Sequence, residues 1–459
     1  MLFFALLLTL AAPTDWVPAR WHWLETKTLD LLSATPINCL LVNWNESQKS
    51  QAARFSAAAA DRGIATLAVI RPGSDPAESA HDAIASKLTG VVLEGDFPAQ
   101  TTARVQTALA GAPLIELTSR RLMPLGSKAP VIGTYQGVWP GIQVLEDGAA
   151  KAGPSGSPWI NTNSGFLRAA RAFGDSVVWI ANLPPSGAVL NSENYLQAIG
   201  DAAMVGARWV VAIDDDFAKR LHSGDAAALK QWQTIGHELQ FYEQHRDWRA
   251  FAPAGKLAVI QGVDDGALLS GGILDMIAAR HTPVRAVPPE RLNPNALQGA
   301  SMAVDVDAAA LTPEQRDILK AFTRSGGTLL TGPAGWKDGA APKKDAITLD
   351  DRQLKHLDDI WHDMQSLIGR GNLGARLFNV SSMLSNLLVS PDGKQKLVHL
   401  VNYSSYPVDS VTVHALGDFK HAWLYTPDAP PKELAVYKVD EGTGIDIDLV
   451  NVSATLLLE

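Results

Sequence analysis

Several short apolar runs in the first half of this 459-residue chain end in carboxylates. Glu94 and Asp96 follow one run, Glu116 lies near the end of the next, and Asp214 follows a later one. Because side chains alternate between the two faces of a β-strand, Glu94 and Asp96 share one face of theirs. If the runs are neighbouring parallel strands, these carboxylates converge at one end of a sheet.

A facing pair of carboxyl groups can cleave a glycosidic bond. One group stays protonated and gives its proton to the leaving oxygen, while the other stays ionised and attacks carbon or activates water. We predict Glu94 and Glu116 as this pair, since mutual repulsion raises the pKa of one member. Asp214 is the alternative partner. A separation of about 5 Å would retain the sugar configuration, and one of about 6.5–9.5 Å would invert it.

Other functions compete for the same acidic residues. Asp214, Asp215 and Asp216 precede Phe217 in the pattern of a helix N-cap. They could also bind a hard cation through oxygen, although their spacing is not that of a calcium loop. The histidines have no HExxH spacing. We therefore expect no metal and no cofactor.

Sugar binding calls for aromatic platforms beside amide and carboxylate groups. Residues of these types follow the apolar runs, and we predict that they contact a carbohydrate: Trp44, Asp96, Tyr135, Trp139, Asn161, Asn163 and Asn182. Trp139 is the preferred platform, because it lies in a Gly- and Pro-rich segment that could overhang a site. Trp179 and Trp209 lie inside apolar runs and are predicted to be core.

The elements that must position these residues alternate between strand-like and helix-like segments. Eight strand candidates are 37–42, 64–70, 88–93, 113–117, 130–134, 158–162, 176–181 and 208–213. Eight such units predict a closed (β/α)8 TIM barrel, in which chemistry takes place at the carboxyl ends of the strands. An open doubly wound sheet is the alternative.

The second half of the chain begins after a long predicted helix at 225–248. A strand at 256–261 and a helix with Thr312 as N-cap and Pro313 at its first position predict a flavodoxin-like α/β domain. A helix at about 350–368 and then short strands predict a C-terminal β-sandwich. The expected divisions are 1–13 as a signal peptide, 14–252 as the barrel, 253–345 as the α/β domain and 346–459 as linker helix and sandwich.

This order resembles a known family. A barrel, then "QFYEQHRDW" and "GKLAVIQG" opening an α/β domain, then a small β-domain resemble the layout of secreted glycoside hydrolases related to β-galactosidases with a trimerisation domain. The "SGGTLLTG" turn at Ser325–Gly332 looks like the glutamine-amidotransferase-like fold used there as a scaffold. The resemblance implies a carbohydrate substrate and allows a homo-oligomer. The chain departs from that family by having Ile115-Glu116-Leu117 instead of an Asn-Glu pair, and Asn182 instead of a carboxylate.

Composition and charge limit the other partners. The net charge of −9, without a dense Lys/Arg run, argues against nucleic acid. The apolar start, Met1 to Pro13, is typical of a signal peptide and predicts a secreted or periplasmic protein with no other membrane association. The single cysteine, Cys39, is predicted to be a buried structural thiol, and it leaves no nucleophile for amidotransferase activity in the second domain.

Two main hypotheses follow. The first is a glycoside hydrolase that uses Glu94 and Glu116. The second is a non-catalytic carbohydrate-binding or scaffolding protein that kept the barrel without the reacting pair. A lyase or an esterase is a further possibility, although no Gly-x-Ser-x-Gly elbow is present.

Overall fold

The computed structural model describes residues 11–73, 75–142, 160–261, 282–305, 311–331, 351–380 and 382–459. Contacts divide the chain into two units. The first unit contains Met1–Gly137, Asp175–Tyr195 and Ala207–Glu243. The second contains Val138–Gly174, Leu196–Gly206 and Gln244–Glu459. No helix among the described residues is long and apolar enough to cross a membrane.

The first unit contains a barrel of eight described parallel strands. Their order around the barrel is β1 (Pro18–Trp21), β2 (Cys39–Asn43), β3 (Ala65–Ile70), β4 (Gly90–Glu94), β5 (Leu114–Thr118), β6 (Val131–Thr134), β9 (Val177–Ile180) and β10 (Arg208–Trp209). A parallel bridge between Ala19 and Val211 joins the last strand to the first. The Arg20 amide donates to the Val211 carbonyl at 2.7 Å. The predicted eight-stranded barrel is therefore confirmed.

The membership of the barrel differs from the prediction in one strand. The predicted strand at 158–162 does not enter the barrel, because its described part, β8 (Ile160–Asn161), pairs antiparallel with β7 (Gly141–Ile142). The first barrel strand is instead Pro18–Trp21, which sequence reasoning missed. The strand that ends at Glu94 is consequently the fourth of the barrel.

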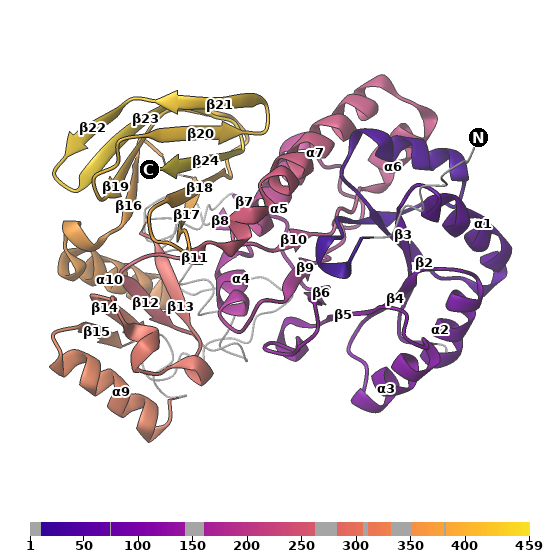
Figure 1. The fold of residues 1–459 in the computed structure, drawn as a ribbon, viewed down its shortest axis with the longest axis horizontal. Helices are drawn as coiled ribbons and strands as arrows, with labels where there is room; N and C mark the ends of the chain where they lie inside the picture. Colours follow the sequence, from indigo (N-terminus) through magenta and orange to yellow (C-terminus); the bar gives the residue numbers. More distant parts are fainter. Residues whose placement is uncertain are drawn as a thin grey trace, which may run out of the picture. The chain divides into compact units, whose positions relative to one another are not determined.

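Two apolar clusters show which strand residues face inward. One cluster fills the barrel and includes Leu41, Val69, Val92, Leu117 and Trp179. The other combines the alternate strand residues with helices outside the strands (Figure 1). The described helices of this unit are α1 (Lys49–Ala60), α2 (Pro76–Ala85), α3 (Ala99–Ala108), α6 (Asp215–Ser223) and α7 (Ala226–Gln244).

Several predictions about the core are confirmed. Trp179 and Trp209 are buried. Cys39 is a buried free thiol in the interior cluster, and burial raises its pKa well above the ordinary value. This thiol is therefore unsuited to act as a thiolate nucleophile.

Besides the short β7–β8 pair, the described part of the second unit holds a parallel sheet and two larger antiparallel sheets. The parallel sheet has the order β13 (Val284–Val287), β12 (Leu257–Ile260), β14 (Met302–Asp305) and β15 (Thr328–Thr331). The larger antiparallel sheet has the order β11 (Ala252–Pro253), β17 (Met383–Val389), β18 (Lys396–Asn402), β24 (Ser453–Leu458), β20 (Ala422–Thr426) and β21 (Ala429–Leu434). The smaller has the order β16 (Ala375–Phe378), β19 (Val408–Leu416), β23 (Gly442–Val450) and β22 (Val436–Val439).

One apolar cluster draws on both antiparallel sheets, which pack around it. The other described helices are α4 (Ser164–Arg171), α5 (Ser192–Ala203), α9 (Pro313–Arg324) and α10 (Asp351–Ile368). The predicted start of α9 is confirmed, since Thr312 and Gln315 form a capping box and Pro313 occupies the first helical position. The chain is therefore mixed α/β, with a parallel barrel and C-terminal antiparallel sheets.

Candidate active site at the barrel mouth

Polar side chains gather where the inward-facing rows of the barrel strands end. Leu41, Val69 and Val92 fill the interior, so Asn43, Arg71 and Glu94, each two residues further on, continue the same rows into the mouth. Hydrogen bonds and an ion pair join these three side chains to one another and to Arg20 of β1. The mouth thus contains a connected polar cluster built from four consecutive strands.

Glu94 is the centre of this cluster. Its carboxylate accepts from Arg20 through both oxygens, with Nη1 at 3.2 Å from Oε2 and Nη2 in contact with Oε1. Arg71 Nη2 lies 2.7 Å from Oε2. Arg20 is itself fixed by a 2.7 Å bond to the Ala181 carbonyl, and Arg71 by a 3.0 Å bond to Asn43 Oδ1. Two guanidinium groups therefore orient one buried carboxylate and compensate its charge.

Asp96 is a second carboxylate of the mouth, and it is exposed. Its Oδ1 accepts from the Ser119 backbone amide at 2.7 Å, and its Oδ2 accepts from the Tyr135 hydroxyl at 3.4 Å. Gly95 allows this arrangement, because its φ of 138° is one that side-chain-bearing residues rarely adopt. A Cβ at Gly95 would also lie 2.9 Å from Pro72. The chain therefore needs glycine between the two acids.

His22 follows β1 and belongs to the same row as Arg20. Its pKa is lowered from the ordinary value, mainly because the protein around it removes water. The charge of Asp215 and a hydrogen bond to the Ile213 backbone oppose this shift, and the charge of Arg20 adds to it. Near neutral pH the ring is consequently uncharged, so it can both donate and accept hydrogen bonds.

Glu116 does not face the mouth, and this part of the prediction is wrong. Its neighbours Ile115 and Leu117 belong to the interior cluster, which places Glu116 on the outer face of β5. There its Oε2 accepts from Thr102 of α3 at 3.4 Å. The catalytic role of Glu116 stays a prediction, and its side chain does not lie in the described barrel mouth.

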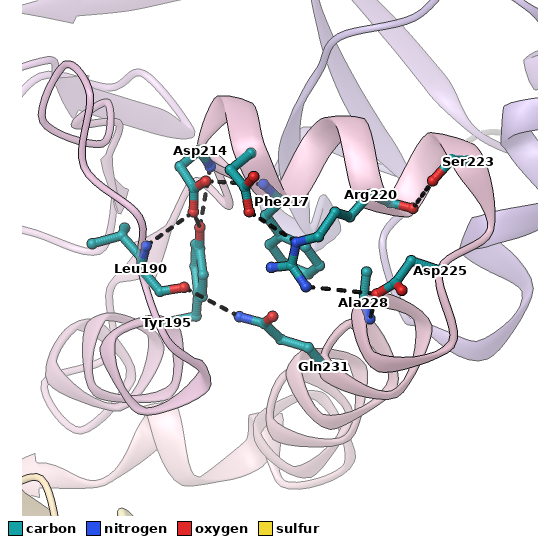
Figure 2. A network of polar contacts seen from close by, with 10 residues as sticks. Leu190, Tyr195, Asp214, Phe217, Arg220, Ser223, Asp225, Ala228 and Gln231 are labelled. Atoms are coloured by element: carbon teal, nitrogen blue, oxygen red, sulfur yellow. Dashed lines mark hydrogen bonds and ion pairs between the residues drawn. The ribbon is translucent and has the colours of Figure 1, made fainter.

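Asp214 is engaged in holding helices (Figure 2). Its Oδ1 accepts from the Phe217 amide at 2.9 Å and caps α6, as the alternative interpretation predicted. Its Oδ2 accepts from the Tyr195 hydroxyl at 2.7 Å and from the Leu190 amide at 3.2 Å. Asp214 is 3% exposed. Both of its oxygens thus serve the local fold, and we give it no chemical role.

Of the other predicted contact residues, Trp44 and Asn182 lie in the first unit. Trp44 packs with the outer cluster between strands and helices, so it faces away from the barrel interior. Asn182 follows β9 and donates to the Gly137 carbonyl at 2.8 Å. The sugar contacts predicted for Asn182 and Trp44 both stay predictions, and the packing of Trp44 places its side chain outside the barrel interior.

Trp139, Asn161 and Asn163 belong to the second unit. Asn161 donates to the Trp139 carbonyl at 3.4 Å. Asn163 is buried and exchanges two 2.9 Å bonds with the backbone of Val138. These two amides hold the chain around the short β7–β8 pair, and their predicted role in sugar binding is not tested by these contacts.

Sequence reasoning missed Arg20, His22 and Arg71. The first two lie on or next to strand β1, which was not predicted. The pattern that could have indicated this strand is the run "WVPARWHW", in which Arg20 alternates in step with Trp16. Arg71 directly follows the strand that ends at Ile70. It was not predicted as a site residue because only carboxylates were considered as reacting groups. Among the described residues, no group of three or more His, Cys, Asp or Glu side chains could hold a metal ion.

Comparison with known proteins places this geometry in context. No family model and no curated protein matches the sequence. Among solved structures, α-L-fucosidase isoenzyme 2 from Paenibacillus thiaminolyticus matches with a TM-score of 0.61 at 11% identity, covering 98% of each chain. A rhamnosidase from Novosphingobium sp. PP1Y matches with a TM-score of 0.45 at 12% identity, covering 92% of this chain and 44% of that one. The first likeness spans nearly the whole chain and shows that this protein shares the fold of that α-L-fucosidase.

Proposed function

We propose that this protein is a glycoside hydrolase whose chemistry is centred on Glu94. The observation that carries the proposal is a buried carboxylate at the end of the fourth barrel strand, held by Arg20 and Arg71 in the mouth. Barrel enzymes react at this end of their strands. The fold shared with an α-L-fucosidase supports the same class of reaction.

The geometry assigns different tasks to the two acids of the mouth. Glu94, with its charge compensated by two guanidinium groups, serves as the ionised carboxylate that attacks the anomeric carbon or deprotonates a water. Asp96 is exposed and two residues further on, and it serves as the proton donor to the leaving oxygen.

The test is turnover of a broad panel of aryl glycosides by the wild type, Glu94→Gln and Glu116→Gln. Glu94→Gln keeps the shape of the side chain but removes its charge, so we expect kcat to fall by about 10²-fold or more. Glu116→Gln is the matched control on the outer face and should stay within a few-fold of wild type. Equal losses in both variants, with folding intact by circular dichroism, would contradict the proposal.

A non-catalytic carbohydrate-binding protein is the second candidate. It is favoured by the positions of Glu116 on the outer face and of Asp214 as a helix cap, which remove both partners predicted for Glu94. On this hypothesis the mouth binds sugar without turnover. Binding of free monosaccharides measured by calorimetry, together with no product from any glycoside after long incubation, would establish it.

We also propose that the apolar N-terminal segment directs export and that the second unit acts as a scaffold. The four-stranded parallel sheet in the second unit supports a flavodoxin-like domain between the barrel and a terminal sandwich. Expression of the full chain in a bacterial host, followed by N-terminal sequencing of periplasmic protein, tests the first point. A mature chain beginning near Pro13 is the expected result, and cytoplasmic retention of the uncut chain would overturn it.

A further inference from the structure

The cluster around Glu94 has more positive than negative charge. Arg20 and Arg71 both pair with the same carboxylate, so the three groups together carry one excess positive charge. Arg20 and Glu94 have side chains only 7% and 8% exposed. Because Arg20 and Glu94 compensate each other in the buried part of the cluster, the charge of the partly exposed Arg71 can attract a further anion.

The other acids of the mouth do not supply that anion in the described contacts. Asp96 directs its oxygens to Ser119 and Tyr135, and Asp214 directs its oxygens to neutral donors. Asp215 acts on His22, whose pKa its charge raises. Within the described part of the chain, no ion pair joins any of these acids to Arg71.

Arg71 is the cation with room for a further partner. Its side chain is 44% exposed, whereas that of Arg20 is buried. Nη2 forms an ion pair with Glu94 and Nη1 donates to Asn43, whereas a guanidinium group carries five N–H donors. Arg20 Nε, in the same cluster, is buried with no hydrogen-bond partner.

We propose that the mouth recognises a sugar that carries a compact oxyanion, such as the carboxylate of a uronic acid or a sulfate ester, and that Arg71 binds this group. A guanidinium group matches two oxygens of a carboxylate or sulfate in a bidentate geometry. The anion would bring the cluster to electrical neutrality. This inference rests on the proposed function, because it assigns the substrate class of the same site.

A simpler role for Arg71 makes a different prediction. If Arg71 only orients Glu94, its loss reduces turnover of neutral and anionic glycosides by the same factor. If it also binds the substrate anion, its loss changes their ratio. The ratio of the two kcat/KM values is therefore the informative quantity.

The experiment uses aryl glycosides that differ only at carbon 6. Glucoside with glucuronide and galactoside with galacturonide form the carboxylate arm, and the same glycosides carrying a 6-sulfate form the sulfate arm. We expect the wild type to prefer an anionic member by about tenfold or more, and Arg71→Gln to lower that ratio about tenfold to a hundredfold. Arg62→Gln, a partly exposed arginine paired with Asp30 in the same unit, is the control and should keep the ratio.

The outcomes separate the two proposals. Turnover with no preference for either anion, or a ratio that Arg71→Gln leaves unchanged, overturns this inference and leaves the glycoside hydrolase standing. No turnover of any glycoside removes the hydrolase, and calorimetry with glucuronate, galacturonate, glucose and galactose 6-sulfate then decides. Anion-selective binding lost in Arg71→Gln supports the inference without hydrolysis, and equal or absent binding overturns it.

Discussion

Glu94 in the barrel and Asp201 in the second unit are both buried carboxylates, but they are held by different chemistry. Glu94 is 8% exposed and paired with two cations. Asp201 is 0% exposed and accepts only from neutral donors. Those donors are the Thr162 hydroxyl, the Asn163 amide at 2.8 Å, the Asn163 side chain at 2.9 Å and the Tyr403 hydroxyl at 2.6 Å.

The difference shows how burial of an acid relates to its use. Burial raises the pKa of Asp201, and the four donors oppose that shift. Its oxygens are fully engaged in joining α5 to the start of α4 and to the strand end at Tyr403, which is a structural task. Glu94 instead has a cationic neighbour, Arg71, whose side chain is 44% exposed. A buried carboxylate that is paired with cations at the barrel mouth is suited to chemistry. A buried carboxylate whose oxygens all accept from neutral donors is suited to stabilising the fold.

The largest effect should come from breaking the charged arrangement. Arg20→Met removes the buried guanidinium and leaves Glu94 with Arg71 alone, which we expect to destabilise the protein by about 3 kcal/mol or more. The double variant Arg20→Met/Glu94→Leu removes both charges and should recover most of that loss. Urea unfolding followed by tryptophan fluorescence measures both. A single variant as stable as wild type would show that the pair contributes nothing.

A smaller effect is expected at the acid held by neutral donors. Asp201→Asn keeps the shape but turns an NH2 group toward N–H and O–H donors. We expect a loss of about 1–3 kcal/mol in the free energy of unfolding, with activity at the barrel mouth unchanged. Urea unfolding and the glycoside assay on one preparation check both parts. Reduced kcat at unchanged stability would contradict the structural role.

His399 is a buried base, and its contribution to stability depends on pH. Burial, together with the charges of Arg171 and His245, lowers the pKa of His399 to about 3. Its folded pKa lies below the unfolded value of 6.5, so stability is full above pH 6.5 and is lost as pH falls toward 3. This group alone should contribute a loss of a few kcal/mol over that window. His399→Gln should show a shallower decline in urea unfolding between pH 6.5 and 4, and parallel curves would contradict this.

The smallest effect should come from an exposed pair. Asp216 and Arg220 form an ion pair at 2.8 Å one helical turn apart, with side chains 50% and 36% exposed. Solvent and salt screen such pairs, so Asp216→Asn should shift Tm by less than about 1 °C. Thermal unfolding checks this. A loss of stability as large as that of Asp201→Asn would show that exposure does not explain the difference between Asp216 and Asp201.

The barrel and several details of its core could be predicted from the sequence, because β-branched runs alternate with helices over the whole first half. The inward direction of Glu94 also followed from alternation. Alternation could not decide which row of β5 faces inward, because both faces of a barrel strand are buried and apolar. Glu116 was assigned to the wrong face for this reason.

The first strand and the cations of the site were harder to predict. Pro18–Trp21 contains an arginine, which makes it unlike an apolar strand, and its contacts with Glu94 and the Ala181 carbonyl explain why it can be buried. Partners far apart in the chain cannot be read from local pattern. The cap at Thr312 was predictable, since all its determinants lie within four residues.

The pairing of Ala19 with Val211 also bears on the order in which the site can form during synthesis. These strands lie about 190 residues apart, so the ring closes only after nearly the whole first half has left the ribosome. Arg20 lies on the strand that waits for this closure. A chain that ends before Val211 therefore lacks the backbone partner of β1, the strand that carries Arg20. Completion of the ring and assembly of the charged cluster are in this sense a single folding event.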